Sequence, residues 1–367
     1  NASGQIAGVD ASTQVPINYK PLEKKYSYGY QTIGIPGVVA GLLKLHKEHG
    51  SLNLNEVMAP AIKYAEEGFN ILPLEALRQQ NAKEKIVEFE GSSTHFLNAK
   101  GEAYKAGDRV IQKTLANTLR QIASKGKAGF YEGEVAEKMV ADIQANGGIL
   151  TLEDLKNYKA LDSKILSGSF QGLDIHALYL PSYGAITLQI LQIMDQLAPA
   201  TSEETWAKQF NEVTALAYSY RKHQQNQDSL SKIIDYAQAK SWAMGIDNGT
   251  KDLVAEALHT LPESWRAALG HTTHLTAADN QGNVISLTQT IGPNMGSKVA
   301  TKDLGFLYAV SLGGYLGEYK PGDRSNSHIS PTLFSKDGEL RLALGAAGGS
   351  RTVTAVTQVS HRYFAQK

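Results

Sequence analysis

The chain has 367 residues, of which 42% are hydrophobic and 20% are charged, and its 36 basic and 36 acidic residues give a formal net charge of zero. This balance argues against an extended positive surface for nucleic acid, and the length allows one large domain or two ordinary ones. Because the sequence has no cysteine, disulfides, thiolate catalysis and cysteine-ligated metal sites are excluded.

The first two thirds of the chain are predicted to be mainly helical. Apolar residues recur at helical spacing over residues 38–49 and 55–67, and a glycine follows each segment. A capping-box pattern that starts at Thr151 predicts a short helix from Glu153 onward. In chain order, the other predictions are helices over residues 114–125 and 134–146, a strand over 170–178, and helices over 185–197 and 204–225.

After Leu269 the pattern changes to strands and turns. Strands are predicted over residues 306–310, 332–334 and 341–344, in addition to a hairpin treated below. The sequence shows no internal repeat, low-complexity tract or clear linker, and no apolar run approaches the ~18 residues of a membrane-spanning helix. This organisation favours one compact fold of layered helices and sheets over two independent domains.

The most informative stretch is the predicted hairpin over residues 272–290, in which two runs rich in β-branched residues flank a turn of Asp, Asn, Gln and Gly. A turn centred on Gln281 places Thr272 across from Thr290, with both side chains on one face about 4.5–5.5 Å apart. A threonine is a poor nucleophile unless a base takes its proton. One solution is a threonine freed by peptide cleavage, whose own α-amine is that base. The alternative is an ordinary half-exposed hairpin, because threonine is common in strands.

Six short runs, spread over the chain in order, carry a resemblance to a known family. They are Gly-Ile-Pro-Gly-Val-Val-Ala-Gly at residues 34–41, Gly-Gly-Ile-Leu-Thr-Leu-Glu-Asp-Leu at 147–155, Pro-Ser-Tyr-Gly at 181–184, Thr-Thr-His at 272–274, Ser-Pro-Thr at 330–332 and Gly-Ala-Ala-Gly-Gly-Ser-Arg at 345–351. Together they resemble the γ-glutamyltransferase (γ-glutamyltranspeptidase) family of N-terminal-nucleophile hydrolases. Members of this family cut their own chain to expose a catalytic threonine.

The resemblance implies cleavage between His271 and Thr272. Thr272 would then be the nucleophile, its new amine would be the general base, and Thr290 would orient it by a hydrogen bond. Thr273 is the neighbouring alternative, but its side chain points to the opposite face of the strand.

The same resemblance implies that the backbone N–H groups of Gly348 and Gly349 form the oxyanion hole. Consecutive glycines let the backbone approach a substrate closely and direct N–H groups at a developing negative charge. Taken alone, a run of this kind is more often a turn or a close packing point.

Four further residues are candidates for binding substrate. Ser327 falls where the family has the first of two serines that contact the substrate, and His328 stands in place of the second. Arg324 could meet a substrate carboxylate, with a structural ion pair as the alternative. Gln5 stands where family members have an Arg that grips the α-carboxylate, and a neutral amide cannot form that ionic clamp.

Two glycines also depart from the family pattern. Gly314 stands where the family has an Asp that holds the α-amino group of the glutamyl donor, and Gly292 replaces the Asn that follows the second threonine. Loss of charged anchors from a shielded pocket weakens binding by orders of magnitude. We therefore expect weak or no action on glutathione. A donor without the free amino-acid head is expected instead, as in the cephalosporin-acylase-like branch of the family.

The implied fold is α+β, a four-layer αββα sandwich that is incomplete at both ends of this chain. Residues 1–271 would form a large-subunit-like part and residues 272–367 the start of a small-subunit-like part, together one structural domain. The expected partners are a small-molecule or peptide amide substrate and the second subunit that self-cleavage produces; no nucleic acid and no membrane span are expected. The family's habit and the lack of cysteine favour a bacterial periplasmic or secreted location.

No cofactor and no metal are expected, since the pairs His46/His49 and His271/His274 lack a third ligand at suitable spacing. A second hypothesis belongs to another functional class. It is an unprocessed, catalytically silent relative that acts as a binding or structural protein.

Overall fold

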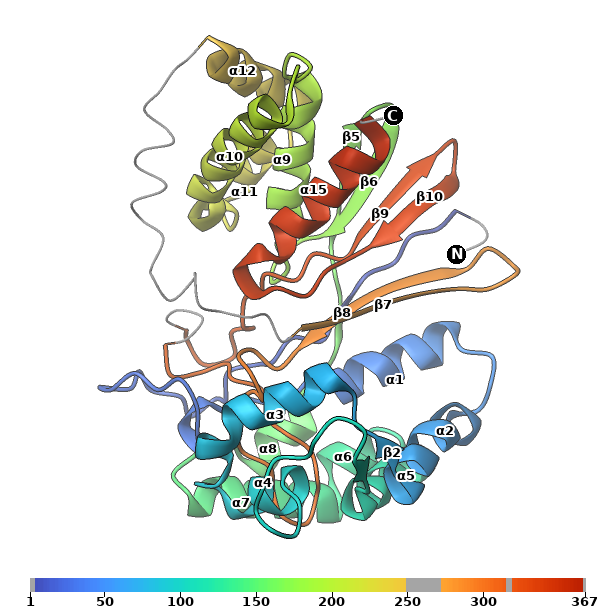
Figure 1. Cartoon of the computed structure of the whole chain (residues 1–367), viewed down its shortest axis with the longest axis vertical. Coiled ribbons are helices and arrows are strands. Elements are labelled where there is room, and N and C mark those ends of the chain that lie inside the picture. Colours follow the sequence, from blue (N-terminus) through green and yellow to red (C-terminus); the bar gives the residue numbers. More distant parts are fainter. Residues whose placement is uncertain (1–3, 249–271, 315–318, 366–367) are drawn as a thin grey trace. The chain divides into compact units, whose positions relative to one another are not determined.

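The computed structural model describes residues 4–248, 272–314 and 319–365, and the chain divides into two compact units (Figure 1). Unit 1 comprises Asn1–Gly8, Asp162–Thr290 and Asn326–Lys367, and unit 2 comprises Val9–Leu161 and Ile291–Ser325. Each unit therefore takes residues from both sides of position 272.

Unit 2 is mainly helical. Its elements are β1 (Val9–Asp10), η1 (Tyr30–Thr32), α1 (Val38–His49), α2 (Leu54–Glu67), β2 (Phe69–Asn70), α3 (Pro73–Ile86), α4 (Glu90–Phe96), β3 (Arg109–Val110), α5 (Lys113–Lys125), α6 (Ala128–Tyr131), α7 (Gly133–Ala145) and α8 (Leu152–Asn157). Strand β4 (Leu161–Asp162) spans the point in the chain at which the first segment of unit 2 ends. The main core cluster joins α6 and α7 to residues 299–308, and contains the fully buried Tyr131, Tyr158 and Tyr308.

The helices predicted for this unit are confirmed to within a residue or two at each end. The capping box at the start of α8 is also confirmed: the Thr151 hydroxyl accepts a hydrogen bond from the Asp154 N–H at 3.1 Å, and the Asp154 carboxylate accepts one from the Thr151 N–H at 3.0 Å. Such reciprocal bonds satisfy two backbone donors that the helix itself leaves unpaired.

Unit 1 combines helices with two antiparallel sheets. Its elements are β5 (Ile165–Phe170), β6 (Leu173–Leu178), α9 (Gly184–Gln196), α10 (Glu203–Ser219), η2 (Arg221–His223), α11 (Gln227–Ile233), α12 (Tyr236–Asp247), β7 (Thr272–Ala278), β8 (Val284–Thr290), β9 (Thr332–Lys336), β10 (Glu339–Leu344), η3 (Gly349–Arg351) and α15 (Thr352–Ala365). One sheet has the strand order β10-β9-β6-β5, and the other is the β7–β8 hairpin.

Helix α9 is the centre of unit 1. Every residue from Gly184 to Met194 is buried, because α9 packs on β5 and β6 and also contacts α10, α12 and α15. A helix that is apolar around most of its circumference is stable only in such surroundings. In Figure 1, α9 and α15 lie on one side of the four-stranded sheet, and the hairpin runs past β10 on the other.

One sequence-based prediction for secondary structure is wrong, and two others are confirmed over a shorter range. The strand predicted over residues 170–178 is present as β6 but begins at Leu173, because Gln171 and Gly172 both have positive φ and form the turn between β5 and β6. The helix predicted over 204–225 ends at Ser219, where the chain continues as η2 and Tyr179 donates a hydrogen bond to the Gln224 carbonyl. Residues 306–310 form no strand: the backbone of Tyr308 bonds to residues 297 and 299 in a loop.

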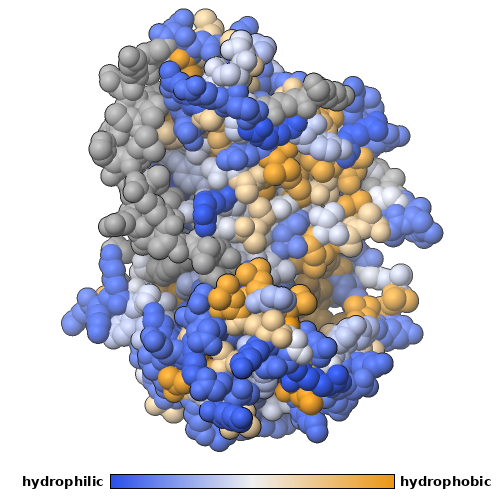
Figure 2. Space-filling view, in the orientation of Figure 1, coloured by the Kyte–Doolittle hydropathy of each residue, from blue (hydrophilic) through white to orange (hydrophobic). Residues whose placement is uncertain are grey.

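Both hydrophilic and hydrophobic side chains reach the surface, as the face in Figure 2 shows. Among the helices that the structure describes, none is both long and apolar enough to cross a membrane.

Candidate active site

The predicted pairing at the start of the hairpin is confirmed. Thr272 pairs with Thr290 in the β7–β8 register, and the Thr272 hydroxyl donates a hydrogen bond to Thr290 Oγ1 at 3.2 Å. Only 8% of Thr272 is exposed to solvent, although it is the first residue of its strand. A buried hydroxyl whose proton has a fixed partner is held in one orientation, as a nucleophile requires.

His274 extends this polar face by two residues. Its ring nitrogen Nδ1 lies 2.8 Å from Thr288 Oγ1, and Nε2 lies 3.0 Å from Thr276 Oγ1. The ring is thus held between the two strands by hydroxyls on either side. Burial lowers the pKa of His274, which favours the neutral ring. No role at the site was predicted for His274 from the sequence, although strand alternation already places it on the face of Thr272.

The same face of the hairpin is attached to strand β10. The Ser286 hydroxyl donates a hydrogen bond to the Leu344 carbonyl at 3.2 Å, and the Thr276 hydroxyl donates one to the Ala343 carbonyl at 3.5 Å. Thr276 and Ser286 are themselves paired across the hairpin. Side-chain bonds therefore fix the end of β10 on the face that carries Thr272.

The segment that follows β10, residues 345–349, is called here the glycine loop. Its first residue, Gly345, touches His274: a Cβ atom on Gly345 would lie 2.3 Å from Nδ1 of that ring. Real Cβ atoms essentially never approach another atom so closely, so only glycine fits. The sequence alone gave no signal for this contact, because it joins residues that are far apart in the chain.

The loop ends at the two glycines that the sequence analysis singled out. Gly348 precedes η3, Gly349 begins it with φ of 57°, and α15 follows directly. The Tyr218 hydroxyl donates a hydrogen bond to the Ser350 carbonyl at 2.9 Å, which fixes the loop on α10. The N-terminal end of a helix carries a partial positive charge, which suits N–H groups that face a developing anion.

Ser327 and His328 lie against the segment that leads into α9. The Ser327 N–H donates a hydrogen bond to the Pro181 carbonyl at 2.8 Å. The His328 ring packs edge-on against Tyr183, with ring centroids 4.8 Å apart. Burial, with a smaller contribution from the charge of Arg221, lowers the pKa of His328 to about 4. The ring is therefore neutral at neutral pH.

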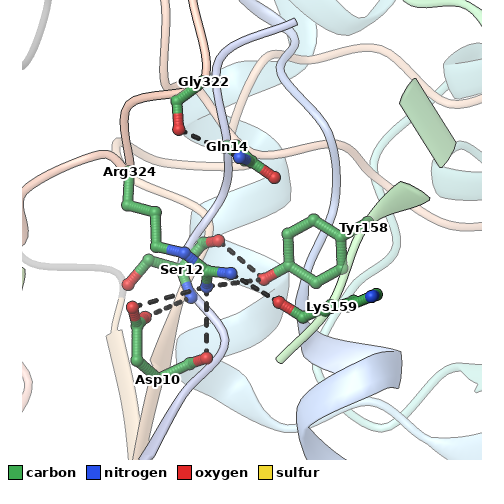
Figure 3. A network of polar contacts seen from close by, with 7 residues as sticks. All are labelled: Asp10, Ser12, Gln14, Tyr158, Lys159, Gly322 and Arg324. Atoms are coloured by element: carbon green, nitrogen blue, oxygen red, sulfur yellow. Dashed lines mark hydrogen bonds and ion pairs between the residues drawn. The ribbon is translucent and has the colours of Figure 1, made fainter. Parts of the chain in front are cut away.

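Arg324 belongs to unit 2 and is held there by a network of polar contacts (Figure 3). Its Nη1 lies 3.4 Å from the Asp10 carboxylate and donates hydrogen bonds to the Asp10 carbonyl at 3.1 Å and the Tyr158 hydroxyl at 3.2 Å. Nη2 donates a hydrogen bond to the Lys159 carbonyl, and the guanidinium stacks over the Tyr158 ring. The ion pair that the sequence analysis considered as the alternative for Arg324 is present.

The structure does not bring Gln5 to the glycine loop. Gln5 is exposed, and its neighbour Gly4 lies near Gly338 in the turn between β9 and β10. The glycine loop follows the opposite end of β10. Gly314 and Gly292, the two glycines expected to depart from the family pattern, have φ of 81° and 90°, a backbone conformation that favours glycine. His271 lies outside the described residues.

Within the residues that the structure covers, no three His, Asp or Glu side chains are grouped so that they could hold a metal ion. The polar groups described for the site are instead threonine and serine hydroxyls, two imidazoles and glycine N–H groups. This set can supply a nucleophile, a hydrogen-bond network and an anion site, which are the components of acyl transfer.

A model of the γ-glutamyltranspeptidase family matches residues 6–367. The capsule biosynthesis protein CapD proenzyme of Bacillus anthracis is 31% identical over 344 residues, which cover 90% of this chain and 60% of that protein. The glutathione hydrolase proenzyme of Escherichia coli is 29% identical over 364 residues, which cover 92% of this chain and 62% of that protein. The chain thus spans about three fifths of the length of these two relatives.

Solved structures of similar proteins share the fold of this chain. The γ-glutamyltranspeptidase of Helicobacter pylori is 30% identical with a TM-score of 0.61, over 65% of this chain and 74% of that one. The cephalosporin acylase of Bacillus halodurans is 23% identical with a TM-score of 0.81, over 99% of this chain and 70% of that one. At this identity the second likeness concerns the fold alone.

Proposed function

This chain belongs to the γ-glutamyltranspeptidase family, and we propose that the protein that carries it catalyses acyl transfer or amide hydrolysis through a threonine acyl-enzyme. The observation that supports this proposal most directly is the 3.2 Å hydrogen bond between the hydroxyls of Thr272, which is buried, and Thr290 at the start of the hairpin. An ordinary surface hairpin has no need to bury a threonine at that position and bond its hydroxyl to a second one.

In the proposed reaction, self-cleavage of the bond between His271 and Thr272 first frees the α-amine of Thr272. Oγ1 of Thr272 then attacks the carbonyl carbon of an amide, and the α-amine takes the hydroxyl proton. The C–N bond of the amide breaks, and the same proton passes to the leaving nitrogen. Water or an acceptor amine then attacks the ester and regenerates the hydroxyl. Thr290 orients Oγ1 throughout.

The negative charge on the carbonyl oxygen would be stabilised by the N–H groups of Gly348 and Gly349. The attachment of β10 to the face that carries Thr272 supports this assignment, because the glycine loop leaves β10 at that face. The start of α15 directly after the loop adds a favourable dipole. Removing one such donor typically costs roughly 10²- to 10³-fold in kcat.

For substrate recognition we propose Ser327 and His328, with an acyl donor that lacks the charged amino-acid head of a γ-glutamyl group. The neutral His328 and the glycine at position 314 supply no charge for an α-amino group. For Arg324, whose guanidinium is engaged with Asp10 and Tyr158, we propose the structural role. Gln5 lies near the end of β10 that is opposite to the glycine loop. An acyl-donor substrate would therefore have to extend along β10 to contact Gln5.

We propose that the helices and sheets belong to a four-layer αββα sandwich, of which unit 1 supplies a helical layer, the four-stranded sheet and the hairpin. Residues 1–271 and 272–367 would be the two parts separated by self-cleavage. Since both units combine residues from before and after position 272, the two parts would stay associated after the cut and together form one folded body.

The release of nitroaniline from a glutaryl p-nitroanilide tests this function. We expect turnover by the wild-type protein, loss of turnover in Thr272→Ala, and partial retention in Thr272→Ser, which keeps a hydroxyl at the same place. Equal rates in the wild type and Thr272→Ala would contradict the proposed nucleophile. An absence of turnover, together with an uncut chain, would favour the silent binding or structural relative.

A further inference from the structure

The contact between His274 and Gly345 joins the hairpin that carries Thr272 to the loop that carries Gly348 and Gly349. It lies only two residues from Thr272 and three residues from Gly348. Both partners belong to unit 1. Any shift of the ring relative to Gly345 would therefore be felt at both ends of the site.

The ring is a fixed surface. Hydroxyls of Thr288 and Thr276 hold its two nitrogens at 2.8 and 3.0 Å, and these two residues come from opposite strands of the hairpin. Rotation of the ring would break at least one of these bonds, because ring nitrogens form hydrogen bonds in the plane of the imidazole. A half-buried ring without such bonds would be free to change rotamer.

The loop rests directly on this surface. A Cβ atom at position 345 would lie 2.3 Å from Nδ1, 2.5 Å from Cε1 and 2.9 Å from Cγ of the ring. The φ of Gly345 lies outside the left-handed region, so the requirement for glycine comes from the approach of the ring and not from the backbone conformation.

We infer that His274 is a positioning residue whose ring, seated on Gly345, sets how closely the N–H groups of the glycine loop approach the Thr272 hydroxyl. This inference rests on the function proposed above and adds to it a residue that touches neither substrate nor the reacting atoms. A group held within a fraction of an ångström by packing and hydrogen bonds is what an oxyanion site needs, since its donors act only in the transition state.

Substitution at both positions tests the inference. Gly345→Ala forces the loop away from the ring, so kcat for glutaryl p-nitroanilide is expected to fall roughly 10- to 100-fold. The kcat values are normalised to the amount of self-cleaved protein, which is the fraction with Thr272 at a chain start. KM is expected to change by less than about threefold, because ground-state contacts are kept. Leu275→Ala is the matched control, since Leu275 is the next residue of β7, is exposed and faces away from β10.

The decisive variants combine Gly345→Ala with removal of the His274 ring that the new methyl group would contact. In His274→Ala/Gly345→Ala and His274→Asn/Gly345→Ala, the added methyl occupies space that the ring has left. Both are expected to be no slower than the corresponding single His274 variant. Thermal unfolding of each protein shows whether it is folded, and the asparagine variant retains a polar group near Thr288 if the alanine variant does not fold.

Two results would overturn the inference. One is a Gly345→Ala variant with kcat within about twofold of the wild type. The other is a double variant whose reduction in kcat equals the product of the reductions in the two single variants. The methyl group added at position 345 would then lower kcat even without the ring. A wild-type protein that neither cuts itself nor turns over the anilide would instead remove the proposed function, and the inference with it.

Discussion

Thr272 and Thr290 face each other across the first pair of the β7–β8 hairpin, with their Oγ1 atoms 3.2 Å apart. Their hydroxyls share one face with His274, Thr276 and Ser286, and that face is bonded to β10. The hairpin thus has one face on which these polar side chains are engaged. Substitutions on this face are therefore expected to lower kcat more than substitutions on the opposite face of the hairpin.

Thr290→Val keeps the shape of the side chain and removes the hydroxyl that accepts from Thr272. We expect kcat to fall about five- to thirtyfold, which corresponds to the loss of about 1–2 kcal/mol of orientation by one hydrogen bond. Thr290→Ser should retain most of the activity. Thr273→Val, a neighbouring exposed position on the other face, is the control, and an equal loss there would show that the effect is not specific to the hydroxyl pair.

The choice of acyl donor is the second prediction. A glutaryl anilide and a γ-glutamyl anilide differ only in the α-amino group, and we propose that Gly314 stands in place of the Asp that would bind this group. We expect the ratio of kcat/KM values to favour the glutaryl compound. Brisk turnover of the γ-glutamyl compound alone would contradict the proposed loss of glutamyl recognition.

The third prediction concerns Arg324, whose side chain is 14% exposed beside an Asp10 side chain that is 9% exposed. Breaking a buried pair by removing one partner costs about 3–5 kcal/mol, so Arg324→Met should lower the unfolding midpoint in urea strongly. Asp10→Asn keeps most of the neighbouring bonds and should cost less. In folded Arg324→Lys, KM should remain close to the wild-type value; a large rise in KM would indicate contact with a substrate carboxylate instead.

The fourth prediction is a pH dependence of stability through His328. Its folded-state pKa of about 4 lies below the ordinary value of 6.5, so the unfolded chain binds the proton first as the pH falls. The contribution of His328 is fully present above pH 6.5 and is lost between pH 6.5 and about 4, by about 3 kcal/mol in total. His328→Gln should flatten this part of the curve of unfolding free energy against pH.

The sequence was sufficient where a feature depends on local pattern. The register of the hairpin followed from its turn and from alternation, and α1 followed from helical spacing with the same bounds. The strand predicted from residue 170 starts at Leu173, and residues 306–310 form no strand. Both differences arise because β-branched and aromatic residues favour strands without fixing where a turn falls or what the backbone pairs with. No local pattern predicts contacts between segments that are far apart in the chain. Two such contacts are the packing of Gly345 against His274 and the ion pair of Arg324 with Asp10.

The most direct test of the central claim is intact-mass spectrometry of the full-length protein that carries this chain, beside its Thr272→Ala variant. We predict two fragments in the wild type, one ending at His271 and one beginning at Thr272, and a single uncut chain in the variant. A single uncut chain in both proteins would contradict the account, because Thr272 would then have no free α-amine to act as its base.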